Sequence, residues 1–234
     1  MSPRENEPMR IMRTALAALA LSAAAVSAPA AQGFGDQTAQ SARLTESDQK
    51  IVQRVEDYLS GVDTMHAEFL QTSSNGSTAR GELWLDRPGK LRFEYQPPHP
   101  ALIVSNGSVL VYYDRDLEQT SYVPISETPL WFLVREDIDM SRIEGYEIAG
   151  IERKRKSIRL SVAQEGSAAG QPGSLTLVFE DEPLRLKKWR IVDQQGIATE
   201  VALLDPRFGI DIDGTKFDFD ALNLPDRRRP SNGR

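Results

Sequence analysis

The stretch GELWLDRPGKLRFEYQPPHP, residues 81–100, carries the clearest signal of the fold. Leu83 and Leu85 alternate with polar neighbours, and the same alternation resumes from Leu91 to Tyr95 after an Arg-Pro-Gly step at 87–89. A period of two is typical of a strand that buries one face. The stretch therefore predicts two strands joined at residues 87–89, and it raises the question of why an arginine stands at the joint.

The same period extends along most of the chain from Met65 onward. Ala67 and Phe69 alternate with polar residues, and Asn106-Gly107 between two apolar runs is a strong hairpin signal because this pair accepts positive φ at low cost. Further strands are expected at 101–104, 109–114, 119–124, 146–151, 156–163, 174–180, 186–193, 197–205 and 215–220. About ten or eleven short strands with turns between them predict an antiparallel meander.

Two segments break this pattern and are expected to be helical. Residues 45–61 begin with Thr45 and acidic residues, and their apolar positions then recur at helical spacing until Gly61. Residues 126–136 place Pro129 where a first helical turn accepts proline, followed by five apolar residues. A helix that is apolar almost all round has to be covered, or has to cover something else.

The expected fold is mainly β. An antiparallel sheet that curls without closing has a concave face that needs cover, and the two expected helices are available to provide it. Such a face can be filled by side chains as an ordinary core. It can equally line an apolar cavity whose ligand is hydrocarbon, and composition does not separate the two.

The termini are expected to lie outside this domain. Arg10 and Arg13 precede an apolar run from Thr14 to Val26, with small residues at 28–30, which is typical of a cleaved secretory signal peptide over 1–30. A flexible N-terminus is expected at 31–44, the domain at 45–224 and a flexible tail at 225–234. The expected location is therefore outside the cytoplasm.

Composition excludes several classes of function. The chain has no cysteine, so neither disulfides nor a thiol nucleophile are available, and its net charge of −6 argues against nucleic acid as a partner. No nucleophile, base and orienting group recur at a recognised spacing, and the two histidines are isolated, so neither catalytic residues nor cofactors nor a metal site are expected. The basic run at 153–156 is compatible with a solvated strand edge or with an acidic partner.

At five stretches the chain resembles the periplasmic outer-membrane lipoprotein carrier family, LolA. They are MHAEFLQ (65–71), GELWLDRPGKLRFEY (81–95), IVSNGSVLVYYDRDLEQT (103–120), TPLWFLVRE (128–136) and KFDFD (216–220). The resemblance covers most of the chain beyond the predicted signal peptide. It implies a periplasmic monomer with an incomplete barrel of ten or eleven strands, closed by short helices over an apolar cavity.

The resemblance also implies roles for individual residues. Arg87 falls on the arginine that, in the family, contacts backbone carbonyls of the lid helices and latches the empty carrier shut. The positions that match the apolar acyl-chain cavity are Leu59, Leu91, Leu130, Trp131 and Leu133, and periodicity adds Val55 and Phe93. Bulky Trp131 and Phe132 put the cavity volume in question.

The implied function is that of a chaperone. It shields the acyl chains of lipoproteins released by an ATP-driven inner-membrane transporter and hands them to an acceptor at the outer membrane. The alternatives are a module of the same fold that binds free lipid or senses lipoproteins, and an interaction module with a filled core.

Overall fold

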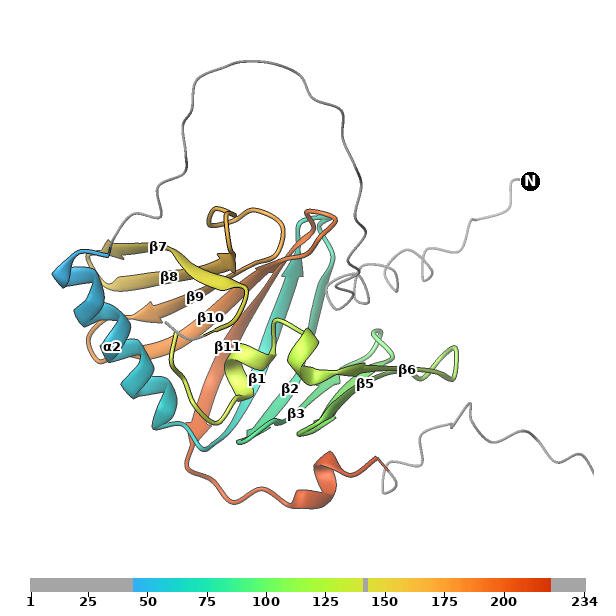
Figure 1. Ribbon diagram of the computed structural model, residues 1–234. Helices are drawn as coiled ribbons and strands as arrows, with labels where there is room; N and C mark the ends of the chain where they lie inside the picture. The colour runs from blue at the N-terminus through green and yellow to red at the C-terminus, as the bar shows by residue number, and fades with distance from the viewer. Residues whose placement is uncertain (1–43, 141–142, 220–234) are drawn as a thin grey trace, which may run out of the picture.

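The computed structural model describes residues 44–140 and 143–219, and these form a single eleven-stranded sheet with two α-helices on one side (Figure 1). The predicted signal peptide, most of the predicted N-terminal segment and the tail at 225–234 lie outside the described residues. The spatial order is β6-β5-β4-β3-β2-β1-β11-β10-β9-β8-β7, and every neighbouring pair is antiparallel. The strands are β1 (Thr64–Ser73), β2 (Thr78–Asp86), β3 (Lys90–Tyr95), β4 (Ala101–Asn106), β5 (Val109–Asp114), β6 (Gln119–Pro124), β7 (Tyr146–Lys154), β8 (Ser157–Gln164), β9 (Ser174–Glu180), β10 (Arg185–Val192) and β11 (Ala198–Phe208).

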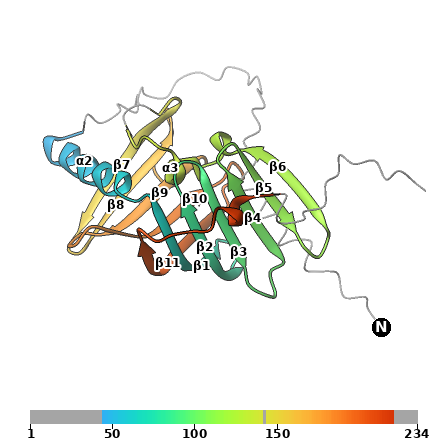
Figure 2. The same cartoon turned by 90° about the horizontal axis from the view of Figure 1, so that it is seen from below.

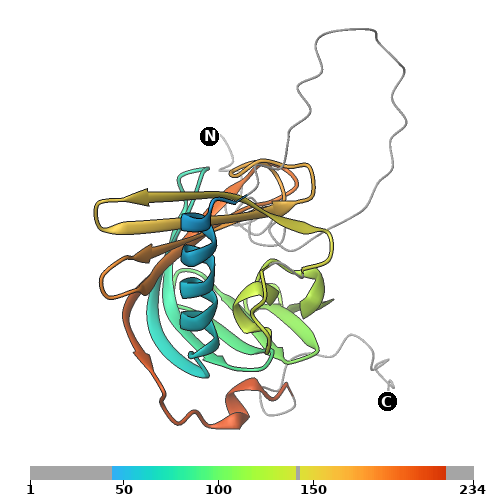
Figure 3. The same ribbon diagram turned by 60° about the vertical axis from the view of Figure 1, so that its left-hand side comes forward.

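The sheet curls without closing, so β6 and β7 remain at its two edges. The predicted open antiparallel architecture is thus confirmed. Helix α2 (Glu46–Ser60) runs across the hollow of the sheet, with α3 (Trp131–Val134) beside it (Figure 3). Among the described residues, no helix is both long enough and apolar enough to cross a membrane.

Helix α2 begins where the capping signal predicted. The Thr45 hydroxyl accepts a hydrogen bond from the Asp48 amide, and the Asp48 carboxylate accepts one from the Thr45 amide, which satisfies two donors that a helix start leaves free. The buried face consists of Ile51, Val52, Val55 and Leu59. This apolar stripe covers the concave face of the sheet as expected.

The segment expected to be one helix over 126–136 is two short pieces instead. A 3-10 turn, η1 (Ile125–Glu127), is followed by the single helical turn α3. Thr128 between them is extended, with φ −110° and ψ 147°, because a residue before proline is driven out of the helical region. Pro129 therefore separates the two pieces and does not start a longer helix.

The strand predicted at 215–220 is also wrong within the described residues. A 3-10 helix, η2 (Gly214–Phe217), forms there next to β3 and β4 (Figure 2). The Asp213 carboxylate accepts a hydrogen bond from the Thr215 amide at 2.9 Å, and Phe217 is buried. A local cap and one buried aromatic outweigh the alternating pattern of this stretch.

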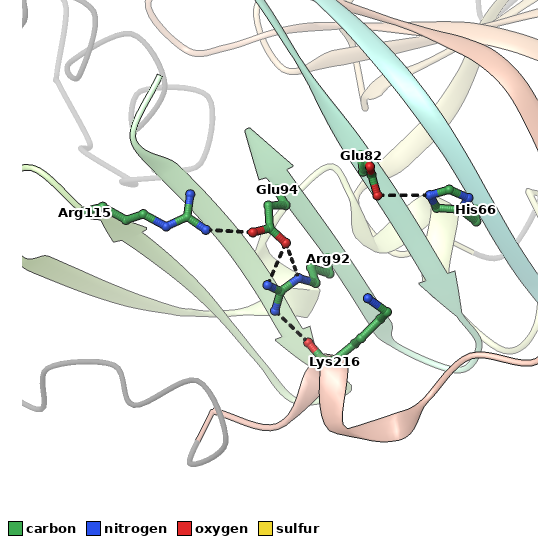
Figure 4. Close-up of polar contacts among 6 residues, drawn as sticks. All are labelled: His66, Glu82, Arg92, Glu94, Arg115 and Lys216. Carbon is green, nitrogen blue, oxygen red and sulfur yellow. Dashed lines mark hydrogen bonds and ion pairs between the residues drawn. The ribbon is translucent and has the colours of Figure 1, made fainter. Parts of the chain in front are cut away.

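Polar contacts hold η2 against the face of β3 that carries Arg92 (Figure 4). Arg92 on β3 donates hydrogen bonds to the Lys216 carbonyl at 3.1 Å and to Glu94 at 2.8 Å, and Arg115 reaches the same carboxylate at 3.0 Å. The Lys216 ammonium lies 4.1 Å from the centre of the Trp84 ring, a cation–π distance. The segment after β11 is thereby fastened across the outside of the first strands.

Candidate functional site

An apolar cavity lies between the helices and the concave face of the sheet. Its volume is about 20 Å³. Its lining residues come from α2, the α3 segment, five strands and the turns next to them, and Arg87 is the one charged side chain among them: Tyr58, Leu59, Val62, Met65, Leu83, Leu85, Arg87, Leu91, Phe93, Leu130, Leu133, Val134, Leu186, Trp189 and Phe208.

The cavity is closed in this structure. A volume of about 20 Å³ holds little more than one water molecule, whereas ligand pockets typically measure roughly 300–1,000 Å³. An apolar ligand of any length could enter only if the lining side chains or the helices moved apart. In this structure the cavity is therefore too small to hold an acyl chain.

Arg87 follows the last residue of β2, and its side chain contacts both α2 and α3. Its Nε donates a hydrogen bond to the Leu133 carbonyl of α3 at 3.0 Å, and its guanidinium also donates to the Leu59 carbonyl near the end of α2. The Gly89 amide, two residues on, donates to the Val134 carbonyl at 2.7 Å. Carbonyls in the last turn of a helix lack intrahelical partners and carry negative partial charge, which explains why a cation with a rigid fork of donors fits here.

The surroundings of Arg87 set its protonation. Burial lowers the pKa of Arg87 to about 10, and the nearby Asp63 carboxylate opposes that shift. The side chain therefore remains a cation at neutral pH. A charged guanidinium facing two helix ends forms stronger hydrogen bonds than a neutral donor would form.

Gly89 allows the turn after Arg87 to approach its neighbour closely. Its φ is +77°, and a Cβ atom there would lie 2.6 Å from the Gly107 Cα in the β4–β5 turn. Ser105 secures the same contact, because its hydroxyl donates to the Gly89 carbonyl at 2.8 Å. This support fixes the position from which Arg87 reaches the helices.

Five of the seven apolar positions proposed from the sequence line the cavity: Leu59, Leu91, Phe93, Leu130 and Leu133. The other two lie elsewhere. Val55 is fully buried between α2 and the sheet, and Trp131 is half-buried at the start of α3, while Phe132 packs edge-on against Tyr146 with ring centroids 5.3 Å apart. The bulk of Trp131 and Phe132 therefore does not fill this cavity.

Several lining residues were missed by the sequence reasoning. Leu83 and Leu85 alternate with polar neighbours on β2, so the period-two signal that identified Leu91 could have identified them as well. Trp189 on β10 and Phe208 at the end of β11 carry no comparable local signal, because their neighbours in the cavity come from distant parts of the chain: the ring centroid of Trp189 lies 6.3 Å from that of Phe93 on β3, and the ring centroid of Phe208 lies 6.5 Å from that of Tyr58 on α2.

A second charged cluster holds α2 to the sheet on its other side. The Asp181 carboxylate is only 5% exposed and accepts hydrogen bonds from Arg54 of α2 and Arg153 of β7, both at 3.1 Å. Burial by itself would raise the pKa of Asp181, but the two arginines outweigh it and hold that pKa below its usual value. Arg153, the first residue of the basic run, thus has its partner within the chain.

The histidines lie away from the cavity. His66 is 3.3 Å from Glu82 (Figure 4), and His99 is 2.7 Å from the Thr78 carbonyl. Within residues 44–140 and 143–219, no group of three or more acidic, histidine or cysteine side chains is placed to hold a metal ion. The described residues therefore form an open antiparallel barrel with an apolar interior covered by helices.

Comparison with known proteins gives the family. Residues 60–220 match the family model described as "Outer membrane lipoprotein carrier protein LolA", and the chain belongs to this family. The outer-membrane lipoprotein carrier protein of Chromohalobacter salexigens is 29% identical over 177 residues, which cover 72% of this chain and 81% of that protein. The carrier protein of Azotobacter vinelandii is 28% identical over 184 residues, covering 74% and 86%. Members of this family are carriers, not enzymes.

A solved structure gives a more distant comparison. A LolA superfamily protein from Nitrosomonas europaea matches 74% of this chain and 97% of its own, with a TM-score of 0.43 and 10% identity.

Proposed function

We propose that this protein is a periplasmic carrier that shields the acyl chains of lipoproteins released from the inner membrane and delivers them to the outer membrane. The observation that carries the proposal is the apolar cavity beneath two helices whose ends are joined by Arg87. Membership of the lipoprotein carrier family supplies the class of cargo. The apolar N-terminal run supports export through a cleaved signal peptide over residues 1–30.

The free energy of burying acyl chains favours partial burial of the cargo over complete burial. Burial of hydrocarbon contributes roughly 0.8 kcal/mol per CH₂, so two long acyl chains buried completely would exceed the practical limit of about 18–21 kcal/mol for non-covalent binding. A carrier with such an affinity could not release its cargo. A cavity that is shut when empty avoids this problem, because part of the binding free energy is used to open it.

In this proposal Arg87 is the latch that biases the carrier toward its closed form. Hydrogen bonds to a charged group contribute about 1.5–3 kcal/mol each, and two of them favour the closed state over an expanded one. The apolar positions Leu59, Leu91, Phe93, Leu130 and Leu133 would contact the acyl chains. Val55 and Trp131 would contribute through the packing of α2 and α3 once the cavity widens.

The partners follow from this cycle. Opening and loading require free energy, which an ATP-driven transporter in the inner membrane would supply. Release would go to an acceptor at the outer membrane, where the acyl chains find a more apolar environment. Because Arg87 favours closure, cargo would leave once that acceptor is offered.

The first test is native mass spectrometry of the full-length chain expressed in a Gram-negative host and recovered from the periplasm. A triacylated polypeptide released when the protein is denatured would support the carrier function. Free phospholipid without polypeptide would identify a lipid-binding module of the same fold. Recovery from the cytoplasm with an intact N-terminus would contradict the proposed location.

A second measurement is needed if the protein recovered from the periplasm carries no bound molecule. A synthetic triacylated lipopeptide is titrated into the purified chain while Trp fluorescence is recorded, with the same peptide lacking acyl chains as control. Saturable binding that requires the acyl chains supports the carrier. Absence of binding would contradict it.

A further inference from the structure

The cavity meets the solvent at one end of the sheet. Most of its lining residues are buried, but Tyr58, Val62 and Arg87 are half-buried, and Phe208 is 39% exposed. These four residues lie where α2 ends, β1 begins, β2 ends and β11 ends. Phe208 is thus both a lining residue and one of the exposed large apolar side chains of the described chain.

A β-bulge in β11 determines which way Phe208 points. His66 of β1 pairs with Arg207, and Glu68 pairs with Leu204. Between these two pairs β11 advances by three residues while β1 advances by two, so β11 contains one extra residue. Asp205 within it has a φ of 45°. Because side chains alternate between faces, one extra residue moves every later side chain to the opposite face.

Leu204 and Phe208 show the result. Leu204 lies before the bulge, pairs with exposed Glu68 and is 37% exposed without lining the cavity. Phe208 lies after the bulge, pairs with buried Met65 and lines the cavity. In a regular strand both residues would share one face. The bulge therefore places an exposed aromatic ring at the mouth of an apolar cavity.

The partners of Phe208 indicate which part of the mouth can move. Its ring meets Tyr58 edge-on, with centroids 6.5 Å apart. Tyr58 is held more firmly, because its hydroxyl accepts a hydrogen bond from the Leu186 amide at 3.1 Å and its ring also packs against Phe179 at 5.8 Å. Because Phe208 is already partly exposed, moving its ring removes less apolar area from the protein interior than moving a fully buried leucine would, and therefore costs less free energy.

We infer that Phe208 is the portal residue of this carrier: an acyl chain inserts beside its ring, against Tyr58, and enters the cavity from this end of the sheet. The inference rests on the proposed carrier function. The alternative route would pass between α2 and α3. Arg87 joins the two helices there through hydrogen bonds to the Leu59 and Leu133 carbonyls, and the side chains of both leucines are buried, so this route would require more contacts to break. Insertion at Phe208 leaves these contacts intact until the chain widens the cavity from within.

A tethered acyl chain tests the portal without requiring the natural cargo. The chain has no cysteine, so Phe208→Cys and Leu204→Cys each create a single attachment point on β11. Each variant is modified with a brominated hexadecyl thiosulfonate in a Trp84→Phe, Trp131→Phe background, in which Trp189 is the remaining tryptophan. Bromine quenches tryptophan emission at short range, and Trp189 lines the cavity.

The portal predicts loss of Trp189 emission for the chain tethered at 208 and unchanged emission for the chain tethered at 204. A methyl thiosulfonate on each cysteine controls for the substitution itself, and circular dichroism verifies the fold. Equal quenching from both positions, or none from position 208, would overturn the inference.

Binding from solution gives an independent reading. Phe208→Asp places a charge at the mouth and should weaken binding of a triacylated lipopeptide roughly tenfold or more, mainly through slower association, because a charge opposes passage of hydrocarbon. Leu204→Asp should bind as the wild type does. If the wild type binds no lipopeptide while the tether at 208 still quenches Trp189, the carrier function fails and the portal stands. If both Asp variants bind at the wild-type rate, the portal fails and the carrier function stands.

Discussion

Arg87 and Leu133 lie 46 residues apart in the sequence, and a 3.0 Å hydrogen bond from the Arg87 Nε to the Leu133 carbonyl joins them. The same guanidinium donates to the Leu59 carbonyl of α2. One side chain at the end of a strand thus connects the two helices. In the proposed cycle, the closed form of the cavity depends on Arg87, a half-buried residue whose side chain can be replaced without truncating an apolar core residue.

Arg87→Leu tests the latch. The fold should survive and cargo should still enter, because the substitution removes two hydrogen bonds at a half-buried position and leaves the apolar lining intact. Transfer of a radiolabelled lipoprotein from the carrier to outer-membrane vesicles should slow roughly tenfold or more, since the closed state loses about 1.5–3 kcal/mol per bond. Transfer at the wild-type rate would rule out the latch while leaving the carrier function in place.

Arg87→Lys is the matched control for charge. A lysine ammonium is a compact donor on a flexible chain and lacks the planar fork that reaches two carbonyls at once. We expect a transfer rate between those of the wild type and Arg87→Leu. A rate equal to that of the wild type would mean that positive charge alone is sufficient.

The cavity can be enlarged by truncating a residue that lines it. Leu91→Ala should cost about 2–5 kcal/mol of unfolding free energy and leave space continuous with the existing cavity. Leu160→Ala, a fully buried core position on β8 that does not line the cavity, should cost a similar amount. Fluorescence of an apolar dye should increase for Leu91→Ala relative to Leu160→Ala, and an equal response from both would argue against a cavity that accepts ligand.

The ion pairs of Asp181 with Arg54 of α2 and Arg153 of β7 should make the free energy of unfolding depend on pH in the acid range. Its folded-state pKa lies below its usual value of about 3.9, so its contribution is present above that pH and is lost as the pH falls through the folded-state pKa. Asp181→Asn should lower the free energy of unfolding by roughly 1–3 kcal/mol at pH 7. The difference from the wild type should shrink on acidification below about pH 4.

Urea titrations from pH 7 to pH 2.5 measure this difference. Glu182→Gln, an exposed carboxyl next in sequence, is the control and should follow the wild-type curve. A constant difference between Asp181→Asn and the wild type at every pH would show that the ionised carboxylate contributes nothing beyond its shape.

Gly89 tests the support beneath Arg87. Gly89→Ala forces a side chain into a backbone with φ +77° and against the Gly107 Cα and carbonyl oxygen, 2.6 and 2.8 Å from the new Cβ. Gly196→Ala has nearly the same φ, +78°, with no atom within 4 Å, so it reports the backbone strain alone, about 1–2 kcal/mol. Thermal unfolding should show a larger loss for Gly89→Ala, together with slower lipoprotein transfer. Equal losses would mean that the β4–β5 turn simply moves aside.

Much of the fold could be predicted because its signals are local. Alternation along β2 and β3, the Asn106-Gly107 turn and the capping residues of α2 each depend on neighbours within a few positions. The two errors were also local in origin. Pro129 divided a predicted helix, and the cap at Asp213 converted a predicted strand into a 3-10 turn.

Local sequence signals predicted an antiparallel sheet with one apolar face, the position of α2 and an arginine at the end of β2. Which residues meet across the hollow of the sheet depends on the three-dimensional arrangement of the strands. It left Val55 and Trp131 out of the cavity, paired Arg153 with Asp181, and turned Phe208 inward through a single extra residue in β11. The physical reason is that periodicity assigns a residue to a face, whereas curl, strand register and bulges decide what that face meets.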